Sequence, residues 1–478
     1  MSNALKMFAV VAAVLVGSAM TTQAATWSAG ADGNWNVAGS WDTGNVPNVA
    51  GETATVNDGS IVTFNLTAAT VPAGPASIDD LSVSGGSTVL VNGASVLDLG
   101  VTNNLTNSAT IQLLNTNQSG HRTMTYTGTS LNNTGGLVQL LVSAGSNGRG
   151  AIFNIESNNT NAGTIEVLTG TLIPAGGAEG NMRDTGGQVR LTGSSTFTNT
   201  GTMRAKWGRN HAIISGVVWD DDNNDGAGGF TYSAGYQQTA ASAVTDVGSI
   251  WYLGYDEGLY DDSPTQGDND GVGVEKYALM GRLEADTVDF DAGTVKSSGS
   301  HGGLIVETGD DQTVELGDGS GDDTTIDVGD SVGILHFGTP EILYHRGDQA
   351  NTVYLPVTST GISLNSDATY EVEIDDDEAD LIVVYGDVSL NGGEISVEHL
   401  SAPSLSEYMI IDVVEEVNEE ATGFTISGAL PTLVGPNAGS WSLEVRESNT
   451  QLWLVPEPAT MVLLGLGGAG LLLKRRRS

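Results

Sequence analysis

The stretch Asn107-Ser-Ala-Thr-Ile111 is the first of a series in which a small polar turn leads into a short apolar strand. The theme returns in four later stretches: Asn133-Thr-Gly-Gly-Leu-Val138, Asn161-Ala-Gly-Thr-Ile165, Gly186-Gly-Gln-Val189 and Asn199-Thr-Gly-Thr-Met203. Successive apolar ends, at positions 111, 138, 165 and 189, lie 27, 27 and 24 residues apart. Such spacing is typical of a parallel β-helix, in which each coil buries its apolar face on the next and asparagine side chains stack at the turns.

The repeats therefore predict an all-β fold, a right-handed parallel β-helix. A β-sandwich is the alternative, because short strands and glycine-rich turns serve both folds. The composition agrees with either fold, since the chain has 65 glycines and only 12 prolines. It has no cysteine, which excludes disulfides, thiol catalysis and thiolate metal sites.

The first 24 residues have the three parts of a secretory signal peptide. Lys6 precedes an apolar run over residues 7–16, and Thr22 and Ala24 are the small residues that signal peptidase accepts. We predict cleavage after Ala24. The alternative, a buried N-terminal helix, is less consistent with the small residues that end the segment.

Residues 25–78 open with three tryptophans, Trp27, Trp35 and Trp41. An exposed end of a solenoid has to be covered, so we interpret this segment as the cap of the first coil. Alternatively, the three rings could stack on sugars and form a carbohydrate-binding site.

The charge divides the rest of the chain. Residues 25–219 carry 11 acidic and 7 basic side chains, a net charge of −4, whereas residues 220–455 carry 46 and 5, a net charge of −41. Such an acidic surface repels nucleic acid and attracts cations. We predict solenoid repeats over 79–219, an acidic loop region over 220–330 and a terminal β segment over 331–454.

A calcium site is one possible reason for the acidity. Asp221, Asn223 and Asp225 alternate as oxygen ligands do in the first half of a calcium loop, but the twelfth position is Tyr232 instead of glutamate. Weaker copies lie at 268–271 and 318–323. Solvated turns, or adaptation to a salty medium, would explain the same residues.

A basic cluster, Arg204, Lys206, Arg209 and His211 around Trp207, offers one catalytic hypothesis. Polysaccharide lyases with β-helix folds use such bases to remove a proton beside a uronate. The alternative is a loop that pairs with the neighbouring acidic residues, which contributes little energy.

The C-terminal sequence predicts a short membrane segment. Pro456-Glu457-Pro458 precedes an apolar run over 459–473, and Lys474, Arg475, Arg476 and Arg477 follow it. As a helix the run would cover about 22 Å of a core of about 30 Å, which is short for a permanent anchor. The basic end would stay in the cytoplasm. Since proline disfavours helix, we expect an extended, accessible stretch in front of the membrane.

The ending over residues 455–478 resembles the PEP-CTERM sorting signal of Gram-negative bacteria that make exopolysaccharide. The resemblance implies that Pro456, Glu457 and Pro458 are recognised by the membrane enzyme exosortase, which removes the tail and passes the protein to the surface or matrix. Exopolysaccharide is then a possible partner.

The segment from Ser331 onward resembles the last coils of an autotransporter passenger. The resemblance rests on Ser366-Asp-Ala-Thr-Tyr370-Glu-Val-Glu-Ile374 and on Asp380-Leu-Ile-Val-Val384-Tyr-Gly-Asp-Val-Ser-Leu390-Asn-Gly-Gly393. Tyr370, Val372 and Ile374 alternate with Glu371 and Glu373, which predicts one buried and one exposed strand face.

Together these features predict a non-enzymatic structural or adhesion protein of the cell surface or exopolysaccharide matrix. A carbohydrate-binding surface protein and a β-helix lyase are the alternatives.

Overall fold

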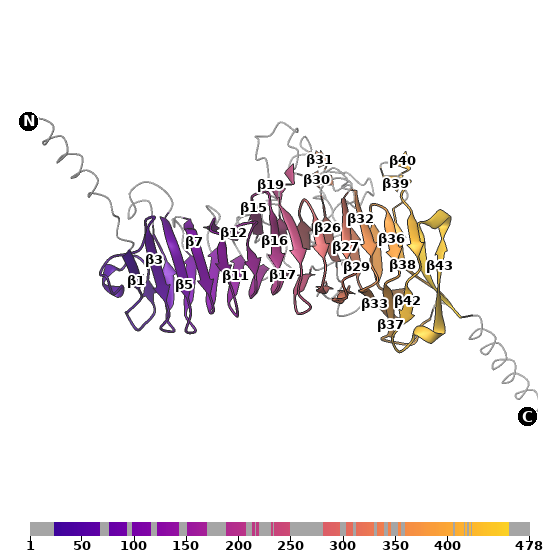
Figure 1. Cartoon of the computed structure of the whole chain (residues 1–478), viewed down its shortest axis with the longest axis horizontal. Coiled ribbons are helices and arrows are strands. Elements are labelled where there is room, and N and C mark those ends of the chain that lie inside the picture. Colours follow the sequence, from indigo (N-terminus) through magenta and orange to yellow (C-terminus); the bar gives the residue numbers. More distant parts are fainter. Residues whose placement is uncertain are drawn as a thin grey trace, which may run out of the picture.

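The computed structural model is an elongated stack of β-strands (Figure 1). It describes residues 23–66, 76–92, 98–115, 122–142, 151–169, 188–206, 213–215, 217–218, 231–232, 234–248, 281–296, 303–308, 312–328, 332–338, 343–345, 352–354, 359–404, 407–414, 416–417, 420–421 and 423–457.

Three long sheets run along the stack. The first sheet contains, in spatial order, β1 (Gln23–Thr26), β3 (Glu52–Val56), β5 (Ala76–Val83), β7 (Leu99–Asn107), β9 (Arg122–Tyr126), β12 (Ala151–Glu156), β15 (Gln188–Thr192), β18 (Ile213–Ser215), β23 (Gly281–Glu284), β26 (Gly303–Glu307), β29 (Ile334–Phe337), β35 (Leu381–Val384), β38 (Tyr408–Val413), β44 (Gln451–Pro456) and β43 (Trp441–Arg446), with β10 (Ser130–Asn132) beside β7.

The second sheet contains β2 (Gly33–Asn34), β4 (Ile61–Phe64), β6 (Thr88–Asn92), β8 (Thr110–Asn115), β11 (Leu137–Val142), β14 (Thr164–Thr169), β17 (Thr202–Lys206), β22 (Val244–Gly248), β25 (Gly293–Lys296), β28 (Thr324–Asp327), β33 (Ala368–Asp375), β37 (Glu394–His399) and β42 (Thr432–Val434), with β34 (Glu378–Ala379) beside β33. The third contains β13 (Thr160–Asn161), β16 (Thr196–Asn199), β21 (Gly235–Gln238), β24 (Val288–Phe290), β27 (Gln312–Leu316), β32 (Thr360–Leu364), β36 (Val388–Asn391) and β41 (Ile426–Ala429).

Smaller elements lie beside these sheets. They are the pairs β19 (Val217–Val218) with β20 (Thr231–Tyr232), β30 (Leu343–His345) with β31 (Thr352–Tyr354) and β39 (Glu416–Val417) with β40 (Glu420–Ala421), and the 3-10 turns η1 (Ala38–Ser40), η4 (Ala438–Ser440) and η5 (Glu447–Asn449).

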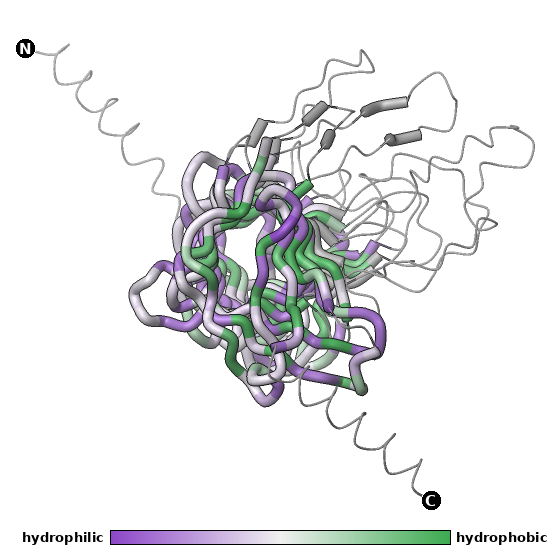
Figure 2. Tube along the Cα trace, turned by 90° about the vertical axis from the view of Figure 1, so that its right-hand side faces the viewer, coloured by the Kyte–Doolittle hydropathy of each residue, from purple (hydrophilic) through white to green (hydrophobic). Residues whose placement is uncertain are grey.

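Each later coil contributes one strand to the first sheet, then one to the third and one to the second, and neighbouring coils pair in parallel. This topology confirms the expected parallel solenoid and excludes the antiparallel β-sandwich. In the early coils, before β13, β5 and β7 are long enough to turn the corner within one strand, and a register irregularity lies between Ile78 and Asp80. Seen along the axis, the coils superpose around one core (Figure 2).

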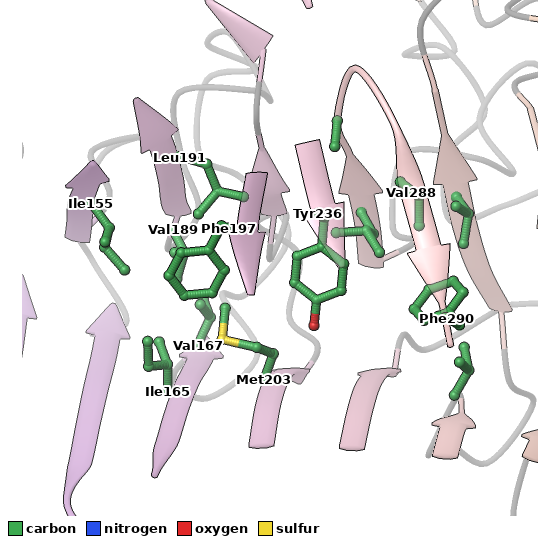
Figure 3. Packing of buried hydrophobic residues seen from close by; sticks show 14 of the residues in the cluster. Ile155, Ile165, Val167, Val189, Leu191, Phe197, Met203, Tyr236, Val288 and Phe290 are labelled. Carbon is green, nitrogen blue, oxygen red and sulfur yellow. The ribbon is translucent and has the colours of Figure 1, made fainter. Parts of the chain in front are cut away.

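Apolar side chains from the three sheets fill the interior. Alternation along each strand sends every second side chain inward, as in β12 and β14, where Phe153, Ile155, Ile165 and Val167 are fully buried. In the third sheet, Phe197, Tyr236 and Phe290 follow one another on adjacent strands, with ring centroids 6.4 and 6.2 Å apart (Figure 3). The side chains of one coil therefore pack on those of the next.

A ladder of buried amides runs along the turns that lead into the second sheet. Asn107 donates to Asn133 at 2.7 Å, Asn133 to Asn161 at 3.1 Å, Asn161 to Asn199 at 3.0 Å, and Asn199 to Gln238 at 3.5 Å. All five side chains are at most 1% exposed. The expected stacking of asparagines is confirmed, and glutamine continues it into the acidic half of the chain.

The glycines that lie two positions after Asn161 and Asn199, Gly163 and Gly201, are required by close packing. A Cβ at Gly163 would lie 1.7 Å from the Asn133 carbonyl oxygen, and one at Gly201 would lie 2.3 Å from the Gly163 carbonyl oxygen. Successive turns therefore stack backbone on backbone, and only glycine leaves room for the coil before it.

The coils are less regular than the spacing of the repeats predicted. Ladder residues are 26, 28, 38 and 39 positions apart. Ile165 pairs with Met203, whereas Val189 lies in β15 and pairs with Phe153 of the first sheet. The prediction that Val189 continues the series was wrong, because coils of a solenoid vary in length where chain is inserted between strands.

Two of the expected domain boundaries also need correction. Residues 25–78 already supply the strands β3 and β4 to the long sheets, so the solenoid begins before residue 79. Residues 220–330, expected to be a loop region, supply β21 to β28 to all three sheets. Their strands are short, but Val288, Val295 and Ile326 are fully buried among outward-facing acidic residues.

The terminal segment follows its predicted pattern. In β33, Tyr370, Val372 and Ile374 are buried, and Glu371 is exposed on the other face. The last described coil is closed by β43 and β44, which pair antiparallel with each other and extend the first sheet beyond β38. In the part of the chain that the structure describes, no helix is long and apolar enough to cross a membrane. The apolar run 459–473 lies outside that part.

Candidate functional site

The first two residues of the Pro-Glu-Pro box, Pro456 and Glu457, lie at the end of the last strand of the solenoid. Pro456 ends β44 and lies opposite Trp441 of β43, and the Glu457 backbone N–H donates to the Ser440 carbonyl at 3.0 Å. Both box residues are half-buried. The expected free, extended stretch therefore does not begin at Pro456; Pro458 lies outside the described residues.

Proline fits this place in the ladder for a simple reason. Hydrogen-bonded and non-hydrogen-bonded pairs alternate along antiparallel strands. Since Glu457 donates to Ser440, the neighbouring pair of Trp441 and Pro456 is a non-hydrogen-bonded one. The N–H that proline lacks is thus not needed there.

Trp441 anchors this end of the hairpin. Its side chain is 6% exposed, and its indole Nε1–H donates to His399 Nε2 at 3.0 Å. Its ring also meets the Tyr408 ring edge-on at 5.6 Å. Burial lowers the pKa of His399, which favours the neutral ring that the indole N–H needs as an acceptor.

The N-terminal tryptophans are not a sugar-binding surface. Trp27, Trp35 and Trp41 are at most 2% exposed, and their rings meet edge-on at 5.3 and 4.8 Å. Trp35 also packs on Phe64 of β4 at 5.4 Å. Stacking on a sugar needs an open ring face, and these rings have none. The carbohydrate interpretation of these residues was wrong, and the cluster covers the end of the core.

Arg204 belongs to a row of charged residues along the second sheet. It lies between Glu166 and Asp246 in register, with nitrogen–oxygen distances of 3.9 and 3.2 Å. The row continues with Lys296 and Asp327, so the signs alternate over five strands. This arrangement favours the structural interpretation of Arg204. The other members of the predicted basic cluster cannot be placed in the same way. The side chain of Lys206 lies outside the part of the chain that the structure describes, and so do Arg209 and His211 as a whole.

Acidic side chains gather over the third sheet and its turns. Asp289 faces Glu315 in register, and Asp291 accepts a hydrogen bond from Gln237 at 2.6 Å. Burial, with Asp291 and Glu315 nearby, raises the pKa of Asp289 to about 6. Burial and acidic neighbours raise the pKa of Asp291 as well. The solenoid therefore holds like charges close together on this side.

The predicted calcium loop, Asp221, Asn223 and Asp225, lies outside the described residues, as does its copy at 268–271. Within the described ranges, no group of three or more acidic or histidine side chains could hold a metal ion. In the turn at 318–323, the Asp318 carboxylate accepts from the Ser320 N–H at 2.6 Å. Calcium at residue 221 remains a prediction.

Asp380 makes stability depend on pH. The side chain is 1% exposed and accepts from the backbone N–H groups of Gly333 at 2.7 Å and Glu373 at 2.8 Å. Burial raises the pKa of Asp380 to about 8 and outweighs these donors. The folded chain therefore keeps a proton that the unfolded chain releases near pH 4, so stability falls as pH rises toward 8.

We expect this loss to be clearest between about pH 6.5 and 8. Burial lowers the pKa of His336 to about 4, and its opposite contribution changes only below about pH 6.5. Urea unfolding should show wild-type stability falling by about 1–2 kcal/mol over that window. Asp380→Asn should be less stable overall but nearly flat with pH. An equal slope in both proteins would contradict the assignment.

The predicted signal cleavage falls within the first strand. Ala24 lies in β1 opposite Thr53 of β3, and the next residue, Ala25, is buried. Cleavage after Ala24 would leave Ala25 and Thr26 to pair with β3. The cleavage position stays a prediction.

Sequence reasoning missed Ser440, Trp441 and His399, the residues that hold the sorting box. A signal was present: Trp441–Arg446 and Gln451–Pro456 are two strand-like stretches joined by a short polar turn, Glu447-Ser-Asn-Thr450. That pattern predicts a hairpin whose second strand ends in the box.

The ending behind the all-β body indicates an exported, membrane-transiting chain with a C-terminal sorting signal. Residues 454–477 match the profile of the PEP-CTERM protein-sorting motif, so the chain carries the signal of an exosortase substrate. No curated protein and no solved structure matches the chain. The likeness of the body to autotransporter passengers therefore remains a resemblance.

Proposed function

We propose that the protein is a non-enzymatic structural or adhesion component of the cell surface or exopolysaccharide matrix of a Gram-negative bacterium. The observation that carries the proposal is the attachment of a sorting motif at 454–477 to the end of a long solenoid. An elongated body of stacked coils spans distance and offers extended faces, as structural and adhesive proteins require.

Two further observations support this proposal over the alternatives. Arg204 is paired with carboxylates in the sheet, which leaves it unsuited to abstract a proton. The N-terminal tryptophans are buried in the cap. The surface of the acidic half would attract cations, and cations could bridge it to an anionic polymer of the matrix.

The proposal is tested in a bacterium that carries an exosortase, by measuring whether the tail of the protein is removed and how much of the protein reaches the matrix. We expect Glu457→Ala combined with Pro456→Ala to leave the tail attached and to reduce the protein in the matrix about tenfold, because the recognition residues are lost. Fractionation with mass spectrometry of both mature ends, with and without calcium, measures this. Glu444→Ala, in β43 of the same hairpin, is the matched control. An intact tail on matrix protein would contradict the proposed processing.

A further inference from the structure

The C-terminal hairpin, β43 and β44, holds the sorting box in a folded ladder. Its open end is the end opposite the turn, where Trp441 faces Pro456, and three contacts hold the two strands together there. The Glu457 N–H donates to the Ser440 carbonyl at 3.0 Å, the Ser442 hydroxyl donates to the Val455 carbonyl at 3.3 Å, and the buried Trp441 lies opposite Pro456. No residue separates the last strand from the box, since Pro456 belongs to both.

An enzyme that cuts a peptide chain needs several residues extended and free of other strands. Folded segments are cut through local opening, and the rate follows the population of the open form when opening is fast. Here Glu457 uses its N–H within the hairpin, and both Pro456 and Glu457 are half-buried. A membrane enzyme therefore cannot surround the box while the hairpin is closed.

We propose that the β43–β44 hairpin controls processing: its open end must separate at Trp441 and Pro456 before the exosortase can bind the box. The proposal rests on the proposed function and adds a regulatory step to it. Trp441 sets how often the end opens, because its burial and its bond to His399 are lost on opening. The folded body and the tail-removing step are thereby coupled.

The first test frees the box without changing it. A Gly-Ser-Gly-Ser insertion between Val455 and Pro456 keeps the spacing of the box to the tail but separates the box from Ser440 and Trp441. In pulse-chase experiments on the full chain we expect tail removal about fivefold faster than in wild type. The same insertion between Ser448 and Asn449, in the turn of the hairpin, is the control and should leave the rate unchanged.

The second test closes the hairpin. Because the chain has no cysteine, Ser442→Cys with Val455→Cys introduces one defined disulfide between paired residues near the open end. We expect tail removal to slow about tenfold and to recover on reduction. Arg446→Cys with Gln451→Cys, a pair four positions nearer the turn, is the control. Unchanged rates in the insertion and the disulfide variants would overturn the proposal.

Hydrogen exchange separates a failure of this proposal from a failure of the proposed function. The Glu457 amide should exchange slowly in the full wild-type chain and fast in the Val455–Pro456 insertion, with no enzyme present. If that difference is seen but no variant loses its tail, the proposed processing is wrong. If tails are removed equally fast in every variant, the control by the hairpin is wrong and the processing stands.

Discussion

Trp35→Ala should cost about 3–5 kcal/mol of stability in the N-terminal coils, the largest loss that we expect from one substitution in the cap. Trp35 is fully buried between Trp41 and Phe64, and its indole N–H donates to the Pro47 carbonyl at 2.8 Å. The substitution removes an aromatic ring from the end of the core and leaves a buried carbonyl without its donor.

The loss should be local, because each coil of a solenoid contacts only its neighbours. Hydrogen exchange with mass spectrometry should show β1 to β4 losing protection, while β32 to β37 keep it. Val37→Ala is the matched control, since Val37 lies in the same cap with 46% of its surface exposed. Trp35→Phe should restore part of the loss. A loss below about 1 kcal/mol would show that these rings do not cap the solenoid.

The same substitution separates the two interpretations that the sequence left open for the tryptophans. Their spacing alone fits an exposed sugar platform as well as a buried cap. Contacts made by the folded chain decide between these two interpretations. Trp27 pairs with Trp41 across the loop, and Trp35 packs on Phe64 of the next coil. These are contacts between distant residues, and single-sequence patterns do not carry them.

The sequence predicted the fold where local chemistry determines it. Asn107, Asn133, Asn161 and Asn199 each begin a turn that needs a small residue and a buried amide, so motif and structure agree. Prediction failed where coil length varies, as at Val189, since spacing cannot tell which sheet a strand joins. Gln238 continues the ladder from a turn, Gln238-Thr-Ala-Ala, that has no asparagine.

The sorting box was found from sequence because a short linear motif at a chain end keeps its order in any fold. Its surroundings were not found. His399 lies 42 positions before Trp441, and only the stacking of β37 near the closing hairpin brings the imidazole to the indole. The prediction of an accessible stretch from the two prolines did not hold at Pro456, because proline can end a strand at a position where no N–H is required.

Asn133→Ala should destabilise the solenoid by about 2–4 kcal/mol, because it breaks the amide ladder in its middle. Asn133 accepts from Asn107 at 2.7 Å and donates to Asn161 at 3.1 Å and to the Thr164 carbonyl at 3.2 Å. Alanine leaves one buried N–H of the Asn107 amide without its acceptor and removes one of the two donors to Asn161 Oδ1, the other being the Gly163 N–H, so the cost exceeds that of one ordinary hydrogen bond.

The neighbouring residue gives a close control for the ladder. Asn132 is exposed and accepts only a bond of 3.3 Å from the Thr134 N–H, so Asn132→Ala should change stability by less than about 0.5 kcal/mol. Urea unfolding followed by circular dichroism compares the two variants. Asn133→Gln, which keeps the amide but adds a methylene beside Gly136, should also be destabilising, because the turns stack without spare room. Equal stabilities of Asn133→Ala and Asn132→Ala would mean that coil stacking is held by the apolar core alone.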